Sequence, residues 1–405
     1  MTPDLSTRIR FILRLAEGLH YYGAPAYRLE RALTIVAQHL RLDAQFFATP
    51  TAIMCSFLKE DGEEISRLVR TEPGEINLQK LSDVDEIADQ VVAGTLAASD
   101  GIRALEEVRR RAPIFPAWAS VCAYGLAAGS FSIFLKAQPI EISLATLCGL
   151  FVGGVTVFAN SSPRFARLSE LLAALACSLL VQGIQFIWPE ASPALLILSG
   201  LLVLFPGLAL TVALSELAMN QLVAGSTRLM QVLIIFFKLI FGVFAGATLI
   251  PHSNKVSDIF ERAEGLGTMA TLGGLLVIPI AFTVLFLARK KDIGWITIAS
   301  WIAFGVARFG TDWFGLGMGT FLAGWIVGTA SNAFARFFHR PASIFLLPGL
   351  LLIVPGSLGY RSFEKLFSGQ LMEGLGVGSQ VIYITIAIVA GLLVGNITLT
   401  PRRSL

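Results

Sequence analysis

The sequence contains Leu204-Phe205-Pro206-Gly207-Leu208 and, 149 positions further on (206 to 355), Ile353-Val354-Pro355-Gly356-Ser357. A glutamine follows both copies at the same offset, as Gln221 and as Gln370. Both Pro-Gly pairs lie in apolar surroundings, where proline removes a backbone donor and glycine permits backbone angles that other residues avoid. Each pair is therefore predicted to interrupt a membrane helix.

Interrupted helices at matching positions of two halves are typical of secondary transporters, because unwound backbone there can contact a solute. The alternative is a packing kink, since membrane helices tolerate proline. The matched register favours the first interpretation. We expect solute to bind at Pro206, Gly207, Pro355 and Gly356.

The composition is that of a membrane protein. Of 405 residues, 55% are hydrophobic and 15% are charged, and the mean hydropathy is +0.71. Residues 1–112 hold 14 Lys/Arg and 17 Asp/Glu, whereas residues 113–405 hold 17 and 11. The first part is predicted to be soluble and the second to cross the bilayer. Neither part has the basic excess of a nucleic-acid-binding protein, so no nucleic-acid partner is expected.

Residues 1–112 are predicted to form a small cytoplasmic α+β domain. Apolar residues recur at helical spacing in four stretches and alternate like strands in three stretches between them. Helices are expected near 9–19, 29–40, 78–91 and 102–108, and strands at 45–48, 52–58 and 65–69. The predicted order is α-α-β-β-β-α-α.

Five residues of this domain are expected to line a pocket: Tyr27, Arg28, Glu30, Thr49 and Thr51. The alternative is solvated charges on a helix surface beside a strand boundary. The sequence has no Walker loop, dinucleotide fingerprint, nucleophile elbow or zinc-protease motif. We therefore expect no catalytic residues, no metal site and no cofactor.

Residues 113–405 contain ten apolar stretches of spanning length. They lie at 116–135, 143–160, 168–187, 193–213 and 229–250, then at 268–288, 293–309, 314–334, 343–360 and 377–398. A shift of 149 residues brings the first five close to the last five. We expect a polytopic α-helical protein with two five-helix repeats, residues 113–255 and 256–405, the second inverted because five is odd.

Lysine and arginine residues at the span ends fall mainly on one side. That side would carry Arg109, Arg110, Arg111, Arg164, Arg167, Arg228, Arg289, Lys290, Lys291, Arg336, Arg340, Arg402 and Arg403, and the other Lys136, Lys255, Arg262, Arg308, Arg361 and Lys365. The positive-inside rule predicts that both termini are cytoplasmic in a multi-pass protein of the plasma (inner) membrane.

Lys238 interrupts the fifth apolar stretch. A charge at this depth is unfavourable by at least about 2.5 to 3.5 kcal/mol, so we expect it to face the solute path. A structural ion pair is the rival interpretation, with Glu170, Glu216 or Asp312 as the counter-charge. Asn160 and the matched Gln221 and Gln370 are expected to contact the solute as well, although interhelical hydrogen bonds are the alternative for such residues.

The chain resembles the threonine/serine exporter family. The similar residues are Gly23, Tyr27-Arg28-Leu29-Glu30, Thr49-Pro50-Thr51, Asn77-Leu78, Lys80-Leu81 and the two Pro-Gly pairs. The resemblance covers nearly the whole chain and implies a cytoplasmic domain followed by two five-span units. It also implies proton-coupled export of small hydroxy amino acids. Some relatives are associated with dicarboxylate export, which leaves the substrate open.

The leading hypothesis is a ten-span secondary exporter of threonine and serine. Its partners would be an amino-acid substrate and the lipid bilayer, and a homo-oligomer is left open. One alternative is a dicarboxylate exporter of the same architecture. Another is a membrane-tethered enzyme or sensor acting through residues 1–112, but an anchor requires neither ten spans nor a repeat, so we expect no enzymatic activity.

Overall fold

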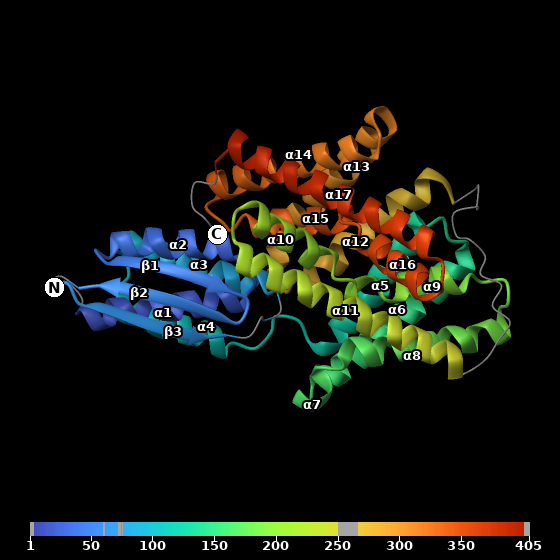
Figure 1. Ribbon diagram of the computed structural model, residues 1–405, viewed down its shortest axis with the longest axis horizontal. Helices are drawn as coiled ribbons and strands as arrows, with labels where there is room; N and C mark the ends of the chain where they lie inside the picture. The colour runs from blue at the N-terminus through green and yellow to red at the C-terminus, as the bar shows by residue number, and fades with distance from the viewer. Residues whose placement is uncertain (1–3, 60, 72–73, 75, 250–265, 401–405) are drawn as a thin grey trace.

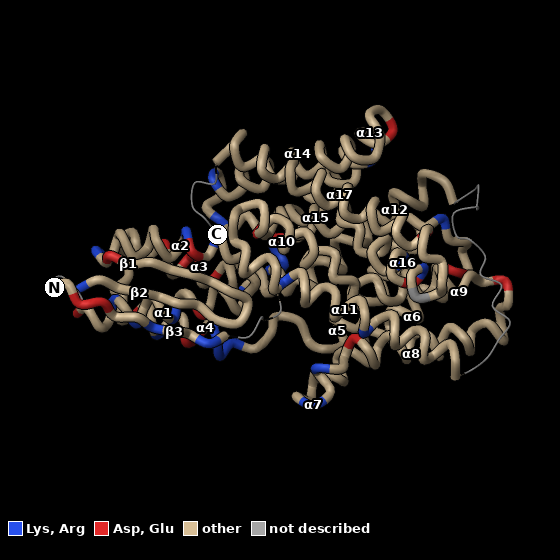
Figure 2. The backbone as a smooth tube through the Cα atoms, in the orientation of Figure 1, with Lys and Arg blue, Asp and Glu red and all other residues tan. Residues whose placement is uncertain are grey.

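A computed structural model describes residues 4–59, 61–71, 74, 76–249 and 266–400. A domain of helices and strands at one end adjoins a long helical bundle (Figure 1). Charged residues are frequent in the domain and sparse along the bundle (Figure 2), in agreement with the uneven charge of the sequence.

The N-terminal domain has the predicted order of elements. It contains α1 (Leu5–Tyr21), α2 (Ala26–His39), β1 (Asp43–Thr49), β2 (Ala52–Leu58), β3 (Glu64–Arg70), α3 (Leu78–Val92) and α4 (Ala98–Arg110). The helices bury their apolar faces, including Phe11, Leu15 and Leu33. Asn77 caps α3, because its side-chain oxygen accepts a 2.9 Å hydrogen bond from the Lys80 amide.

The strands form one antiparallel sheet in the order β1-β2-β3. Ile53 and Phe57 point toward the helices and are buried, as the alternation of side chains along a strand requires. Met54 lies on the opposite face, where it pairs with Phe47 and Leu68, and these three side chains are 44–65% exposed. The helices therefore cover one face of the sheet and leave this apolar row open.

The bundle contains helices of both expected halves. The first half comprises α5 (Ala117–Phe134), α6 (Pro139–Asn160), α7 (Pro163–Ala166), α8 (Ser169–Ile187), α9 (Pro193–Gly200), the 3₁₀ turn η1 (Leu202–Leu204), α10 (Gly207–Ala218) and α11 (Leu222–Leu249). The second comprises α12 (Gly267–Leu285), the 3₁₀ turn η3 (Lys290–Asp292), α13 (Ile293–Phe314), α14 (Leu316–Phe338), α15 (Ser343–Ile353), α16 (Gly356–Phe367) and α17 (Leu371–Thr398).

Among the described residues, eight helical segments are long and apolar enough to cross a bilayer, and one of them, Ser343–Leu366, comprises α15 and most of α16. A ninth is obtained if α9 and α10 count as one span, which bends by 53° where α9 ends. The span expected at 193–213 is thus two shorter helices, and the second begins at Gly207, as expected if Pro206 interrupts the helix. α14 stands where the eighth span was expected, but its many Gly, Thr and Ser residues keep it outside this set. By this measure the bundle has eight or nine spans rather than the expected ten.

The end of each half is repeated helix by helix. α10 begins and ends 149 positions before α16, and α11 begins 149 positions before α17. The turn after α10 contains Asn220 at φ 61°, and the turn after α16 contains Gly369 at φ 84°. Asparagine and glycine are the residues that adopt this left-handed conformation most readily. The local backbone therefore repeats together with the sequence.

Side-chain packing interlocks the two halves. Tyr360 of α16 is 2% exposed and belongs to a core otherwise built from the first half. Conversely, Leu208 of α10 lies in a core with Leu350 and Ile388 of the second half. The helix that follows each Pro-Gly pair is thus packed against the other half.

Glycines let the long helices approach their neighbours closely. A Cβ atom on Gly242 of α11 would lie 2.6 Å from the carbonyl oxygen of Leu171 in α8. A Cβ on Gly391 of α17, at the matching position, would lie 2.2 Å from that of Phe321 in α14. Both glycines therefore allow close helix packing, because small residues let the backbones of neighbouring membrane helices approach.

The N-terminal domain is joined to the second half through α3. The amides of Leu78 and Gln79, in the first turn of α3, donate to the carbonyl oxygens of Phe286 and Leu287 at 2.9 and 3.1 Å. These amides have no partner inside their own helix, so the end of α12 satisfies them. Arg289, two residues further on, pairs with Asp83 of α3.

Candidate functional site

The two Pro-Gly pairs lie against each other where α10 and α16 begin. A Cβ atom on Gly207 would lie 2.9 Å from the Cα of Gly356 and 2.6 Å from Cγ1 of Val354. A Cβ on Gly356 would in turn lie 3.3 Å from the Cα of Gly207. The backbones of the two halves therefore touch at these glycines, which are 149 residues apart in the sequence.

The backbone at the two breaks is nearly the same. Pro206 has φ −80° and ψ 35°, and Pro355 has φ −82° and ψ 45°, outside the regular helix and strand regions. α10 starts at Gly207 and α16 at Gly356, so the first amide groups of both helices are gathered in one place. Two positive helix ends there favour a solute carboxylate.

The contact is closed in this structure. Phe205, Gly207 and Gly356 are buried, and the ring of Phe205 lies 5.2 Å from that of Tyr360, which is also buried. A solute could reach the backbone here only after α10 or α16 moved. Such a movement is what an alternating-access carrier requires.

Lys238 is held by the start of α8. Its ammonium group donates to the carbonyl oxygen of Arg167 at 2.9 Å and to the carboxylate of Glu170 at 3.3 Å. Phe236, two residues earlier, packs on Phe363 of α16, and two residues turn a helix by about 200°. Lys238 therefore faces away from α16, and its contacts favour the structural ion pair, with Glu170 as the counter-charge.

Three other expected solute ligands lie away from the Pro-Gly contact. Asn160 is the last residue of α6 and is exposed. Gln221 and Gln370 lie just after α10 and α16, at the far end of each 12-residue helix. Since a helix advances about 1.5 Å per residue, these glutamines lie about 18 Å or more from the glycines.

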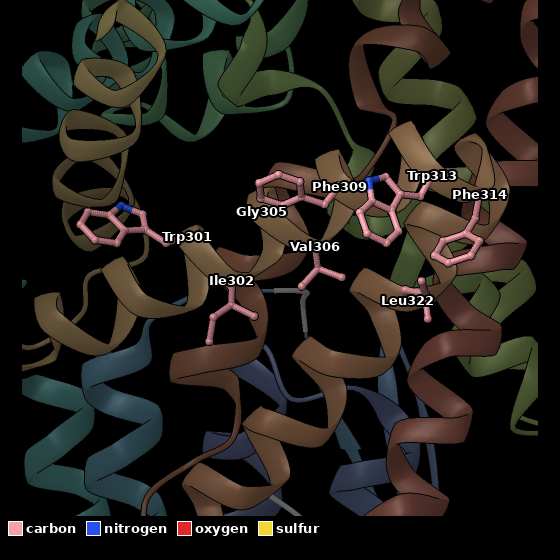
Figure 3. Close-up of a pocket in the computed structure, with 9 residues that line it drawn as sticks. Trp301, Ile302, Gly305, Val306, Phe309, Trp313, Phe314 and Leu322 are labelled. Atoms are coloured by element: carbon pink, nitrogen blue, oxygen red, sulfur yellow. The ribbon is translucent and has the colours of Figure 1, made fainter. Parts of the chain in front are cut away.

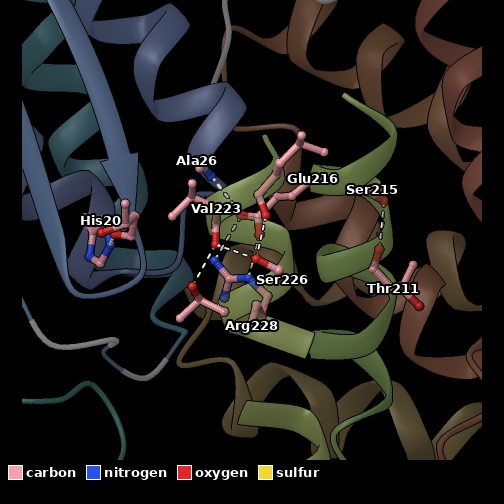
Figure 4. A network of polar contacts seen from close by, with 11 residues as sticks. His20, Ala26, Thr211, Ser215, Glu216, Val223, Ser226 and Arg228 are labelled. Atoms are coloured by element: carbon pink, nitrogen blue, oxygen red, sulfur yellow. Dashed lines mark hydrogen bonds and ion pairs between the residues drawn. The ribbon is translucent and has the colours of Figure 1, made fainter. Parts of the chain in front are cut away.

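The turn after α10 meets the N-terminal domain in a polar cluster (Figure 4). The carboxylate of Glu216, which is 0% exposed, accepts hydrogen bonds from Arg228 of α11 at 3.0 and 3.1 Å. It also accepts one from the amide of Ala26, at the start of α2, at 3.1 Å. A buried carboxylate needs such partners, so this cluster joins α2, α10 and α11.

Glu30 extends the same contact. Its carboxylate accepts a 2.7 Å hydrogen bond from the amide of Ala48 and a 2.6 Å bond from the side-chain amide of Gln221. Burial raises the pKa of Glu30, and these two hydrogen bonds oppose the increase. Glu30 and Gln221, expected at two separate sites, are thus brought together at the boundary of the domain.

The remaining residues of the expected pocket are engaged locally. The Thr49 hydroxyl donates to the Ala52 carbonyl at 3.0 Å and accepts from its amide at 3.1 Å, which closes the turn between β1 and β2. The Thr51 carbonyl accepts a bond from the amide of residue 71. Arg28 is 7% exposed and lies 5.9 Å from the ring of Tyr27.

His20, Glu216 and Arg228 are the cluster residues that sequence reasoning did not assign to a site. His20 lies 2.9 Å from the Thr49 carbonyl oxygen. Burial lowers the pKa of His20, the hydrogen bond to Thr49 raises it, and the positive charge of Arg228 lowers it further. The sequence did contain a signal for the pair, because Glu216 and Arg228 are charged residues in two consecutive apolar helices.

A separate apolar hollow of about 530 Å³ lies on α13 (Figure 3). Its lining includes Trp301, Phe309 and Trp313, the last of which is 80% exposed. The lining is almost entirely apolar, so the hollow offers no polar group to orient an amino acid. The part of the chain that the structure describes also holds no group of three or more side chains suited to a metal ion.

Two family models match this chain. The first, described as "Putative threonine/serine exporter", covers residues 10–250, and the second, described as "Threonine/Serine exporter, ThrE", covers residues 274–398. The boundary between them falls between the two halves of the bundle. No solved structure matches the chain.

Curated relatives come from fungi. The chain is 25% identical over 434 residues to "Pheromone-regulated membrane protein 10" of Zygosaccharomyces rouxii, covering 98% of this chain and 43% of that protein. It is 27% identical over 384 residues to the protein of the same name in Pichia sorbitophila, with coverage of 90% and 38%. It is similar also to "Uncharacterized protein C16A10.01" of Schizosaccharomyces pombe, at 23% identity. The chain spans less than half the length of these relatives.

Proposed function

The chain belongs to the threonine/serine exporter family, and from this membership we propose that it is a secondary exporter of threonine and serine driven by the proton gradient. The observation that carries the proposal is the contact between Gly207 and Gly356. Two helix N-termini meet there, and the backbone amides of each can attract a carboxylate without a charged side chain. The exporter would hold its solute between the halves.

We propose further that the bundle consists of ten spans in two inverted repeats, residues 113–255 and 256–405, with α14 as the eighth span. The matched positions of α10, α11, α16 and α17 support a repeat, and its five-span length supports the inversion. Residues 1–112 would form the cytoplasmic domain. Both termini would be cytoplasmic in the plasma membrane, because Lys and Arg favour that side.

A second candidate function is export of dicarboxylates by the same architecture. Its support is that two positive helix ends, rather than one, meet at the glycines. A dicarboxylate would engage both ends, whereas threonine or serine would engage one with its carboxylate and need an acceptor for its ammonium group.

The test is transport by the purified protein in proteoliposomes loaded with threonine, serine, alanine or succinate. We expect an imposed proton gradient to accelerate release of threonine and serine over alanine, and a protonophore to remove the effect. Release of succinate alone would replace the first candidate by the second. Release of none of the four solutes would contradict both.

The site is tested with Gly207→Ala. The new methyl group would press on the backbone of Gly356, and overpacking of about 1 to 3 kcal/mol corresponds to a loss of transport of about 5- to 150-fold. Gly183→Ala is the matched control, because it lies in helix α8 and a Cβ there has nothing within 4 Å. Equal transport by the two variants at equal abundance would remove the glycine contact from the site.

A further inference from the structure

We propose that the N-terminal domain is part of a gate, and that Glu216 and Lys365 are equivalent positioning residues that fasten α10 and α16 in their closed places. The inference rests on the proposed function, because it assumes that these two helices move to expose the Pro-Gly contact. It assigns a role in transport to a domain that otherwise has none.

α10 and α16 each form an ion pair through a residue at the same position of the repeat. Glu216 precedes Lys365 by 149 positions, and both lie in the last turn of their helices. Glu216 pairs with Arg228 of α11, and Lys365 pairs with Glu373 of α17. The charges are reversed, but each ion pair joins the short helix to the long helix that follows.

The surrounding turns are also alike. The amide of Gln221 donates to the Glu216 carbonyl at 2.8 Å, and that of Gln370 donates to the Lys365 carbonyl at 3.0 Å. A Cβ on Gly225 would lie 2.9 Å from the Leu217 amide nitrogen, and a Cβ on Gly374 would meet Leu366 at the same distance. Each short helix thus packs against the long helix that follows it so closely that the contact requires glycine.

The two ion pairs differ in their exposure to solvent. Glu216 is 0% exposed, whereas the side chains of Lys365 and Glu373 are 23% and 58% exposed. The difference comes from the N-terminal domain, which adds the Ala26 amide to Glu216 and the Glu30 carboxylate to Gln221. Moving α10 would break these bonds and uncover a buried charge, whereas moving α16 would separate an ion pair that water already reaches.

The domain also reaches the second half. Leu78 and Gln79 of α3 bond to the end of α12, while α2 bonds to Glu216 of the first half. The N-terminal domain therefore contacts both halves, on one side of the bundle. Opening on that side requires the domain to release at least one of the two attachments.

The experiment measures from which side the Pro-Gly contact can be reached. Thr211, buried one turn inside α10, is replaced by cysteine in a chain whose four native cysteines are replaced by serine or alanine. The protein is placed in proteoliposomes of known orientation. A small charged methanethiosulfonate reagent is then added to either side, and the rate of modification is recorded.

Ala26→Pro removes the amide that donates to Glu216, and proline is compatible with the backbone there because Ala26 is the first residue of α2. We expect modification from the domain side to increase about tenfold, as for loss of one hydrogen bond to a charged group. Ala98→Pro, at the first residue of α4, is the matched control and should leave the rate unchanged.

Glu216→Gln should increase modification from the domain side, and Lys365→Met should increase it from the opposite side. Unchanged sidedness in Ala26→Pro and in both of these variants would overturn the proposal and leave the ion pairs a purely structural role. The same result for Ala98→Pro as for Ala26→Pro would also overturn it. The labelling needs no substrate, so failure of threonine export would count against the proposed function and not against the gate.

Discussion

Lys238 shows how one charge is accommodated in a helix that is otherwise apolar. Its depth suggested a role in the solute path, yet its rotation on α11 turns it toward Glu170 and the Arg167 carbonyl. The side chains of the pair are 30% and 24% exposed, so the pair is neither fully buried nor free in water. A partly shielded ion pair between spans is sufficient to retain a lysine here.

We expect Lys238→Met to lower the free energy of unfolding by about 1 to 3 kcal/mol, because it leaves Glu170 without its cation. The double variant Lys238→Met, Glu170→Leu should recover most of the loss. Thermal melts and transport rates of the two single variants and the double variant form the test. A double variant that melts normally but does not transport would return Lys238 to the mechanism.

We expect His20 to make the stability of the N-terminal domain sensitive to pH. Burial lowers the pKa of His20 below the ordinary histidine value of about 6.5, so the folded protein disfavours the protonated form. The stability that depends on neutral His20 is complete above pH 6.5 and is lost as the pH falls through the lowered folded value. Glu30, whose pKa is raised, contributes in the opposite sense, losing stability as the pH rises through its folded value.

We expect His20→Gln to reduce the decrease in melting temperature between pH 7 and pH 5, because glutamine can still donate to the Thr49 carbonyl but takes up no proton. His39→Gln is the control, since His39 is an exposed histidine at the end of α2. The prediction fails if the two variants follow the same pH profile as the unmodified protein.

Among the elements, the turn after each short helix is the most closely repeated. A Cβ on Gly374 would press on Leu366, 2.9 Å from its amide nitrogen, whereas a Cβ on Gly376, two residues along the same helix, would meet nothing within 4 Å. α17 therefore touches α16 along one narrow face only. The matching glycine of the first half, Gly225, makes the same contact with Leu217.

We expect Gly374→Ala to destabilise the protein by about 1 to 3 kcal/mol through overpacking against backbone. Gly376→Ala should be neutral or slightly stabilising, because alanine is the better helix former by about 1 kcal/mol. Gly225→Ala should resemble Gly374→Ala, and melting temperatures in detergent compare the three variants. Similar values for Gly374→Ala and Gly376→Ala would show that α17 does not pack tightly against Leu366 at position 374.

At the scale of the whole molecule, the orientation of the bundle decides on which side of the membrane the N-terminal domain lies. The proposed topology places Ser161, after α6, on the cytoplasmic side, and Glu190, after α8, on the other. Both are exposed. We expect a membrane-impermeant thiol reagent on intact cells to label a cysteine at position 190 and not one at position 161, in a chain without native cysteines. The opposite pattern would invert the topology and place the domain outside.

The membrane class, the order of elements in the N-terminal domain and the repeat of the Pro-Gly segment could all be predicted from the sequence, because each depends on local composition and periodicity. The apolar stretches, the alternation over β2 and the matched Pro-Gly pairs are properties of neighbouring residues. Even the family could be inferred, since its motifs are short and lie in order along the chain. The solute-binding role of the Pro-Gly pairs remains a prediction.

The contact of Gly207 with Gly356 and the cluster of Ala26, Glu30, Gln221 and Glu216 depend on tertiary packing. Their members are up to about 190 positions apart, and no local pattern specifies which helix faces meet. Lys238 illustrates the same limit, because its contact with Glu170 depends on how α8 packs against α11. Composition determines that a buried charge must have a partner, and only the packing of helices determines which partner it has.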